Sequence, residues 1–178
     1  MEIRPLRADD HDAVGRLTVD AYMQVEPAAV DVDYVAELRD VASRSTGVEI
    51  LVADDGGRVV GAVTYVPGPG SPAAEFTEAD AAGIRMLAVA VDAQGRGVGE
   101  ALTRACVARA REAGRAQVIL HSTDRMATAH RLYRRLGFVR DPSIDWRPDP
   151  GPWLRGFRLR LHDRPPASRG GGEPSPVT

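Results

Sequence analysis

Residues 87–100 read LAVAVDAQGRGVGE, an apolar run followed by glycines at three alternate positions. The apolar run predicts a buried strand, and the helical spacing of the apolar residues after it predicts a helix that ends at Gly114. The first turn of a helix exposes unpaired backbone N–H groups and carries the positive end of the helix dipole. Because Gly95, Gly97 and Gly99 have no side chains, an anion can approach this backbone closely. The segment therefore predicts a phosphate-binding turn.

Two common phosphate-binding motifs fit this turn poorly. A P-loop ends in Gly-Lys-Ser/Thr, and the chain contains no lysine. The dinucleotide-binding fingerprint is Gly-x-Gly-x-x-Gly, whereas this turn reads Gly-x-Gly-x-Gly and its strand does not open a parallel unit. A nucleotide-binding protein is therefore a weak alternative, and so is a tight connection that binds no ligand.

Hydrophobic patterning predicts one domain over residues 1–162. Residues 48–53 and 58–66 flank an Asp-Asp-Gly-Gly turn and predict a hairpin. Further strands are predicted at 3–6, 83–91, 117–121, 138–140 and 153–161, and helices at about 9–22, 31–43, from the glycine turn to 114, and at 125–136. This order predicts an α+β fold in three layers, with a mixed, mostly antiparallel sheet between helices. The tail at 163–178 is rich in Pro, Gly and Ser and is predicted to be disordered.

Composition and charge narrow the function classes. The chain has 178 residues, of which 43% are hydrophobic and 27% charged, as in globular proteins. A formal net charge of -2 argues against a nucleic-acid partner, and no apolar run is long enough for a membrane span. The single cysteine, Cys106, excludes an intrachain disulfide, and the charged first residues do not resemble a signal peptide, so we expect a cytoplasmic protein. The absence of lysine and asparagine indicates a GC-rich, bacterial genome.

Two motifs together resemble the GNAT superfamily of N-acetyltransferases. The first is Gln-x-x-Gly-x-Gly at 94–99 after an apolar strand, and the second is Tyr-x-x-x-Gly-Phe at 133–138 with Ala129 four residues before the tyrosine. The resemblance implies a GNAT-like sheet with a splayed central strand pair, acetyl-CoA as cosubstrate and no metal. It further implies acetyl transfer to a primary amine of a small molecule or a protein N-terminus, by a monomer or homodimer. A non-catalytic acyl-CoA-binding regulatory module is the alternative.

The resemblance also implies roles for individual residues. The backbone of Leu87, Ala88 and Val89 would pair with the pantetheine arm, and a bulge in this strand would separate it from its neighbour. The phenol of Tyr133 would protonate the leaving thiolate, since the two groups have similar acidity; the alternative is a core tyrosine. Cofactor contacts are expected from the amides of the glycine turn and from the two motifs, that is from Gln94, Gly95, Arg96, Gly97, Val98, Gly99, Glu100 and Ala129.

Two positions depart from the family pattern. Met126 stands where many members have an asparagine that bonds pantetheine, and Arg85 stands where many have a glutamate base. His121, at the end of the next predicted strand, is the expected catalytic base, although a structural hydrogen bond would also explain it. Further candidates for the base are Asp124, Glu75 and Glu78.

The acceptor pocket is expected between the first helices, the loop before the central strand and the final hairpin. Acidic residues in these segments predict an acidic lining that suits a cationic amine. They are Glu26, Asp31, Asp33, Glu37, Glu75, Glu78 and Asp80. Trp146 and Trp153 are expected either to wall this pocket or to pack in the core.

Overall fold

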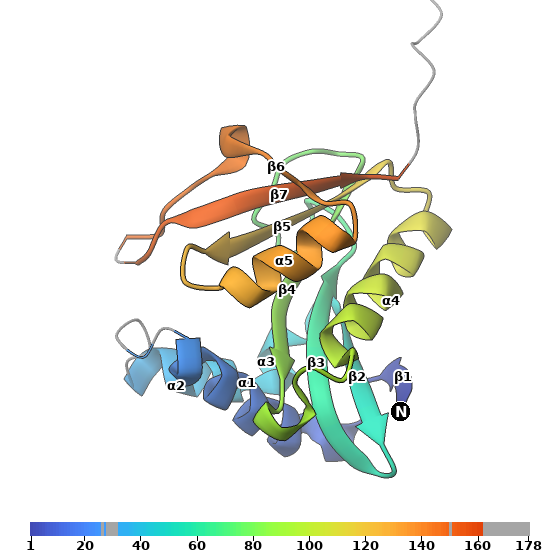
Figure 1. Cartoon of the computed structure of the whole chain (residues 1–178), viewed down its shortest axis with the longest axis vertical. Coiled ribbons are helices and arrows are strands. Elements are labelled where there is room, and N and C mark those ends of the chain that lie inside the picture. The colour runs from blue at the N-terminus through green and yellow to red at the C-terminus, as the bar shows by residue number, and fades with distance from the viewer. Residues whose placement is uncertain (26, 28–31, 150, 162–178) are drawn as a thin grey trace, which may run out of the picture.

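The computed structural model describes residues 1–25, 27, 32–149 and 151–161 (Figure 1). Its strands are β1 (Glu2–Pro5), β2 (Glu49–Asp55), β3 (Arg58–Val66), β4 (Ala81–Val89), β5 (Gln117–Thr123), β6 (Val139–Arg140) and β7 (Leu154–Arg160). Its α-helices are α1 (His11–Val25), α2 (Val32–Arg39), α3 (Val41–Arg44), α4 (Val98–Glu112) and α5 (Ala127–Arg135). Short 3₁₀-helices occur at Ala8–Asp10, Val91–Ala93 and Pro142–Ile144.

The seven strands form one sheet in the order β1-β2-β3-β4-β5-β7-β6. Among the strands of the described residues, only β4 and β5 pair in parallel, and every other neighbouring pair is antiparallel. Figure 1 shows α1, α2 and α3 on one side of the sheet and α4 and α5 on the other. The predicted α+β class, with a mostly antiparallel sheet between helices, is confirmed.

Two apolar cores hold these layers together. Alternate residues of a strand point to opposite faces of a sheet, and in β2 Leu51 packs toward α4 whereas Ile50 packs toward α1. The larger core also contains Leu102, Cys106 and Tyr133 from α4 and α5. The helices are therefore fixed on both faces, and β4 lies at the centre of the sheet between them.

The sheet opens at the middle of β4. The register against β3 passes from Ala62↔Ala88 to Thr64↔Arg85, so β4 carries one extra residue there, and Met86 has a positive φ of 52°. This is a β-bulge. Beyond Ile84, β4 no longer pairs with β5, although both strands continue. The predicted splayed strand pair is thus confirmed, and the two strands diverge in Figure 1.

Some predicted boundaries are wrong. The helix predicted at 31–43 is two helices, because the Asp40 side chain accepts hydrogen bonds from the N–H and hydroxyl of Ser43 and caps α3. The central strand runs two residues earlier than predicted, since its pairing with β5 starts at Ala81. Residue 31 and the tail at 163–178 lie outside the described residues. Within the described part of the chain, no helix has the length and hydropathy needed to span a bilayer.

Candidate functional site

The predicted phosphate-binding turn joins β4 to α4. Gly95 and Gly97 have φ values of 74° and 82°, and Gly97 is the residue immediately before α4. Residues with a Cβ avoid this left-handed region at a cost of roughly 1–2 kcal/mol, so the backbone of the turn itself favours glycine. A Cβ at either position would meet no atom within 4 Å, which means that the space over the turn is open.

The backbone N–H groups from Gly95 to Glu100 have no hydrogen-bond acceptor among the residues that the structure describes. The first backbone bond at this end of α4 runs from the N–H of Ala101 to the carbonyl of Gly97, at 3.0 Å. Six successive N–H groups at the positive end of a 15-residue helix are therefore available to an anion. This arrangement fits the diphosphate of coenzyme A.

Side chains around the turn are engaged away from this row of N–H groups. Arg96 pairs with Asp55 of β2 at 2.9 Å, and Glu100 pairs with Arg104 and Arg135 at 2.9 and 2.8 Å. The Arg135 and Arg104 hydrogen bonds lower the pKa of Glu100. The side-chain amide of Gln94 donates to the carbonyl of Val89 and to the side chain of Gln24, so it links the end of β4 to α1.

The end of β4 presents polar backbone groups to the open side of the sheet. The N–H of Ala90 donates to the carbonyl of Val60 in β3 at 2.9 Å. Hydrogen-bonded and non-hydrogen-bonded pairs alternate along an antiparallel ladder, and Val89 pairs with Gly61 in between. The N–H of Val89 therefore points away from β3, toward the side where β5 has separated. Leu87 and Ala88 connect the bulge at Met86 to Val89, and Ala88 is buried.

Tyr133 lies on α5 with its ring buried between two phenylalanines. Its exposed fraction is 4%, and the ring centroids of Phe138 and Phe157 are each 5.9 Å away. Burial raises the pKa of the phenol. The hydroxyl has no hydrogen-bond partner among the described residues. Ala129 lies one helical turn earlier and packs against the same core.

Glu75 brings His121 and Arg85 together on the opposite side of the β4 bulge. One carboxylate oxygen of Glu75 lies 2.6 Å from Nη2 of Arg85, and the other lies 3.7 Å from Nδ1 of His121. Arg85 also donates to the carbonyl of Ala73 at 3.1 Å, which holds the loop before β4. The His121 side chain is only 3% exposed and that of Glu75 17%. The loop before β4 therefore places a carboxylate beside Arg85, the strand position at which the sequence lacks the expected glutamate.

The tautomer of His121 follows from its second contact. Its Nε2 lies 2.8 Å from the carbonyl oxygen of Ile144. Because a carbonyl only accepts hydrogen bonds, Nε2 carries the proton and Nδ1 keeps the lone pair in the neutral ring. The basic nitrogen of His121 is thus the one that faces Glu75. A structural hydrogen bond, which the sequence left as an alternative, uses Nε2, whereas the role of a base uses Nδ1. The two interpretations of His121 are therefore compatible.

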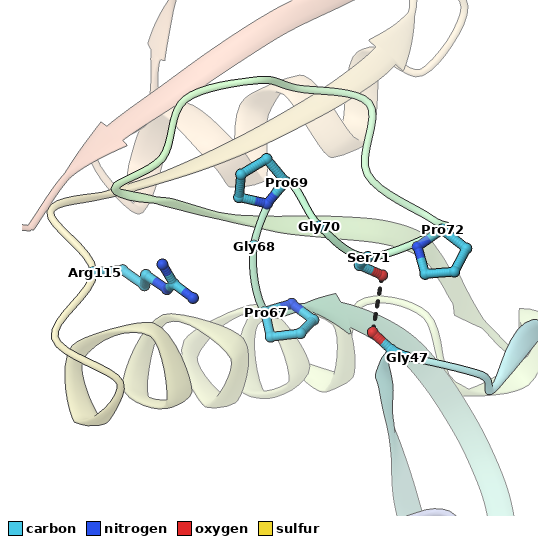
Figure 2. A pocket seen from close by; sticks show the side chains of 8 residues that line it. All are labelled: Gly47, Pro67, Gly68, Pro69, Gly70, Ser71, Pro72 and Arg115. Atoms are coloured by element: carbon cyan, nitrogen blue, oxygen red, sulfur yellow. Dashed lines mark hydrogen bonds between the residues drawn. The ribbon is translucent and has the colours of Figure 1, made fainter.

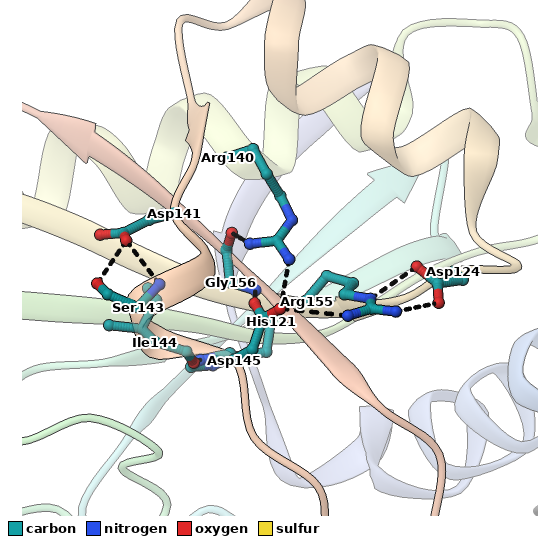
Figure 3. A network of polar contacts seen from close by, with 9 residues as sticks. All are labelled: His121, Asp124, Arg140, Asp141, Ser143, Ile144, Asp145, Arg155 and Gly156. Atoms are coloured by element: carbon teal, nitrogen blue, oxygen red, sulfur yellow. Dashed lines mark hydrogen bonds and ion pairs between the residues drawn. The ribbon is translucent and has the colours of Figure 1, made fainter.

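Asp145 holds the loop that supplies the Ile144 carbonyl. Figure 3 shows its carboxylate accepting from the N–H of Gly156 at 2.9 Å, from Arg155 at 3.3 Å and from Arg140. A Cβ at residue 156 would come within 2.2 Å of Ile144, so this close approach requires glycine. Asp145 therefore fixes the position of the His121 hydrogen-bond partner.

Two other candidate bases form ion pairs with arginines other than Arg85. Asp124 forms a two-point pair with Arg155, with both distances 2.8 Å (Figure 3), and this contact lowers its pKa. Glu78 pairs with Arg158 at 2.9 Å. Of the four candidates from the sequence, the structure brings only His121 and Glu75 together.

Of the seven residues expected to form an acidic lining, Glu75 lies beside His121 and Arg85, and two others are paired with different groups. Glu78 faces Arg158, and Asp80 accepts from Gln117 at 2.7 Å. Asp33 and Glu37 are exposed on α2, and Glu26 and Asp31 lie outside the described residues. Tyr22 and Tyr34 interact electrostatically with Glu75 and Arg85, and Arg44 interacts with both tyrosines. Sequence analysis missed Tyr22, Tyr34 and Arg44 because aromatic and long side chains on amphipathic helices resemble core residues.

The two tryptophans differ in position. Trp146 lies beside His121, with the ring centroids 6.4 Å apart in an edge-on arrangement. Trp153 is half-exposed and stacks against Arg155 instead. Only Trp146 therefore borders the proposed acceptor side.

A separate groove of about 330 Å³ lies beside the proline-rich loop (Figure 2). Arg115 lines it together with Gly47 and residues 67–72, and Ser71 donates to the carbonyl of Gly47 at 2.8 Å. Arg115 follows the C-terminal end of α4, whereas the glycine turn precedes its N-terminal end. The groove contains none of the predicted site residues.

Comparison with known proteins agrees with this geometry. The profile of the acetyltransferase (GNAT) family matches residues 13–138. Mycothiol acetyltransferase from Cellulomonas flavigena is 37% identical over 91 residues, which make up 51% of this chain and 26% of that protein. This chain thus spans about a quarter of the length of that relative.

Solved structures share the fold at low sequence identity. A GNAT-family acetyltransferase from Staphylococcus aureus Mu50 superimposes with a TM-score of 0.71 at 14% identity, covering 90% of this chain and 99% of that one. A putative acetyltransferase from Salmonella typhimurium, solved with acetyl-CoA, superimposes with a TM-score of 0.66 at 21% identity, covering 92% and 95%. With the family profile spanning both the glycine turn and Tyr133, this chain belongs to the GNAT family of acetyltransferases.

Proposed function

We propose that this protein transfers the acetyl group of acetyl-CoA to a primary amine of a small molecule or a protein N-terminus. The observation that carries the proposal is the row of six unengaged N–H groups from Gly95 to Glu100, placed beside the opening between β4 and β5. The first turn of any helix leaves about four N–H groups without an intrahelical acceptor, and here the two turn residues before Gly97 extend that row to six. A bound diphosphate gives them one.

In this proposal, residues on the α4 and α5 side act on the acetyl donor. The N–H groups of the glycine turn bind the diphosphate, and the N–H of Val89 donates to the thioester oxygen as negative charge develops there. Tyr133 donates its proton to the departing sulfur. Burial raises the pKa of the phenol, and the same apolar surroundings raise the pKa of the thiol, so the proton transfer stays nearly balanced.

The opposite side of the opening prepares the acceptor. An ammonium group must lose a proton before its nitrogen can attack, and Nδ1 of His121 takes that proton. Glu75 stabilises the resulting imidazolium from 3.7 Å. The amine nitrogen then forms a bond to the acetyl carbon, the carbon–sulfur bond breaks, and the sulfur receives the proton of Tyr133. The acylated nitrogen loses its second proton to solvent, solvent returns a proton to the Tyr133 phenolate, and His121 releases the proton that it took from the ammonium group. Orientation of the two reactants supplies much of the rate enhancement in reactions of this kind.

The test is a turnover assay with acetyl-CoA and a panel of primary amines. Free thiol release would be followed continuously, and the acetylated amine identified by mass spectrometry. A parallel thermal-shift comparison of coenzyme A, ATP and NAD reports which ligand stabilises the fold. We expect stabilisation by coenzyme A and amine-dependent thiol release. Stabilisation without turnover for any amine would instead support the regulatory module, and stabilisation by ATP or NAD alone would contradict the cofactor assignment.

A further inference from the structure

Arg44 of α3 is a partly buried cation at the acceptor side of the β4 bulge. Its Nε donates to the carbonyl of Leu38 at 3.1 Å, one terminal nitrogen to the hydroxyl of Thr18 at 3.1 Å, and the other to the sulfur of Met86 at 3.5 Å. A guanidinium has five N–H hydrogens. These contacts use three, which leaves one N–H on each terminal nitrogen.

No carboxylate of the described chain lies within 4.0 Å of this guanidinium, although Arg85, its neighbour across the bulge, is paired with Glu75. The acidic residues nearest in sequence are Asp40 and Glu37, and both are exposed to solvent. Burial lowers the pKa of Arg44, as it does for a cation without a close anion. A partly desolvated charge of this kind gains most from an anionic partner.

The position of Arg44 relates it to the proposed chemistry. Met86, which it contacts, is the bulge residue directly after Arg85. Thr18, which it also contacts, lies one helical turn before Tyr22 on the same face of α1. Tyr22 packs edge-on against Tyr34 with the ring centroids 6.0 Å apart. Arg44, the two tyrosines and the Glu75–Arg85 pair therefore border one side of the opening in the sheet.

Resting on the function proposed above, we infer that the acceptor is an amino acid: its ammonium lies at Glu75 and His121 and its carboxylate binds Arg44. This side of the site then holds one carboxylate for the cation, and for the anion one guanidinium that has no carboxylate of the described residues within 4.0 Å, although Asp40 acts on it from farther away. Two N–H groups on separate terminal nitrogens allow two-point recognition of a carboxylate, which an amine without that group cannot use.

The experiment compares matched acceptors that differ only in the carboxylate. The panel pairs α-amino acids, and ω-amino acids of increasing chain length, with the amines that lack the carboxylate. The readout is kcat/KM for thiol release from acetyl-CoA. We expect the wild-type protein to favour the carboxylate-bearing member of its best pair by at least about tenfold, the scale of one charge-assisted contact.

Variants assign that preference to Arg44. R44Q should reduce the preference at least about fivefold, and R44K should reduce it less, because lysine keeps the charge but loses the planar fork. The control is Arg39→Gln, an exposed arginine at the end of α2, which should keep the wild-type preference. Circular dichroism and coenzyme A binding check that each variant is folded.

Three results would overturn the inference. Equal or better turnover of every amine that lacks the carboxylate would do so in the wild-type protein alone, whether or not the variants fold. An unchanged preference in folded R44Q would remove Arg44 from recognition. Thiol release with none of the amines would contradict the proposed function as well, whereas turnover without carboxylate preference would contradict only the amino-acid acceptor.

Discussion

Nδ1 of His121 lies 3.7 Å from a carboxylate oxygen of Glu75. The other oxygen of Glu75 pairs with Arg85, so one loop carboxylate links two residues on neighbouring strands. Although β4 has Arg85 where a glutamate was expected, this side of the sheet still contains an acid, because Glu75 from the loop before β4 pairs with Arg85. The imidazole, with its other nitrogen held by the Ile144 carbonyl, keeps a fixed basic nitrogen beside that acid.

We predict that Glu75→Gln lowers kcat/KM about 10- to 100-fold. This loss is smaller than the roughly 100- to 10,000-fold contribution of a general base, because His121 itself remains. The amide keeps the size of the side chain but no longer stabilises a protonated His121 or neutralises Arg85. The matched control is Glu78→Gln, because Glu78 lies on the same loop but pairs with Arg158. Equal losses in the two variants, measured by thiol release, would indicate a general effect on the loop instead of a role for Glu75.

We predict that Tyr133→Phe lowers kcat more than about tenfold, because sulfur then leaves without a proton. Coenzyme A affinity should stay near the wild-type value, since the apolar ring remains. Tyr65→Phe is the matched control: Tyr65 is also buried with an unpaired hydroxyl, but it lies away from the opening. Unchanged kcat in Tyr133→Phe would remove this residue from the mechanism.

The raised pKa of Tyr133 predicts how kcat depends on pH. Burial raises the pKa of the phenol, so the protonated form needed for donation persists to higher pH than that of a free phenol, which titrates near about 10. The wild-type kcat should therefore show no fall below about pH 10 that depends on Tyr133. A fall between about pH 8 and 9 that is present in wild type and absent from Tyr133→Phe would contradict this assignment.

Gly97→Ala should weaken coenzyme A binding at least about tenfold, because a methyl group would project into the open space beside the turn that the diphosphate is proposed to occupy. The substitution also strains the backbone, since φ at this position is 82°. Gly57→Ala imposes the same kind of strain at φ 87° in the β2–β3 turn, where a Cβ likewise meets nothing within 4 Å. Both variants should lose about 1–2 kcal/mol of stability, and calorimetric titration should show lost affinity only in Gly97→Ala.

Asp145→Asn tests the loop that holds the Ile144 carbonyl. Loss of the charge weakens the contacts to Arg140 and Arg155, and we expect His121 to lose its fixed orientation. The prediction is a fall in kcat/KM of about three- to tenfold, or about 0.7–1.4 kcal/mol, with altered pH dependence. This is less than the roughly 1.5–3 kcal/mol of one charge-assisted bond, because Asp145 acts only through the position of the loop. The control Asp124→Asn breaks the other pair of Arg155 without touching the loop. An identical pH profile in Asp145→Asn and wild type would contradict the positioning role.

Local patterns predicted most of the elements, and the reason is visible in particular residues. The Asp54–Gly57 turn fixed the hairpin of β2 and β3, and apolar spacing located α4 and α5. The break at Asp40 was not predictable from periodicity, because it depends on whether an aspartate caps a new helix or remains on the surface of a continuous one. The insertion of β7 between β5 and β6 depends on long-range pairing, which hydrophobic spacing does not report.

The candidate site likewise contains residues that local sequence patterns located and residues that depend on long-range contacts. The glycine turn and Tyr133 belong to contiguous motifs, so the sequence located them. Glu75 was one of several equal acidic candidates, because only the folded chain separates it from Glu78 and from Asp124, which are paired with arginines. Arg44 gave no local signal at all, since its position depends on contacts with Thr18 and Met86, 26 and 42 residues away.

The central claim is that the N–H groups from Gly95 to Glu100 hold the diphosphate of coenzyme A. An amide NMR titration tests it most directly, because each N–H group reports its own hydrogen bonding. Addition of coenzyme A should shift the signals of residues 95–100 together and saturably, with smaller changes near Tyr133. Saturable shifts confined to other regions, such as the groove beside Arg115, or an unchanged glycine turn at saturating ligand, would contradict the account.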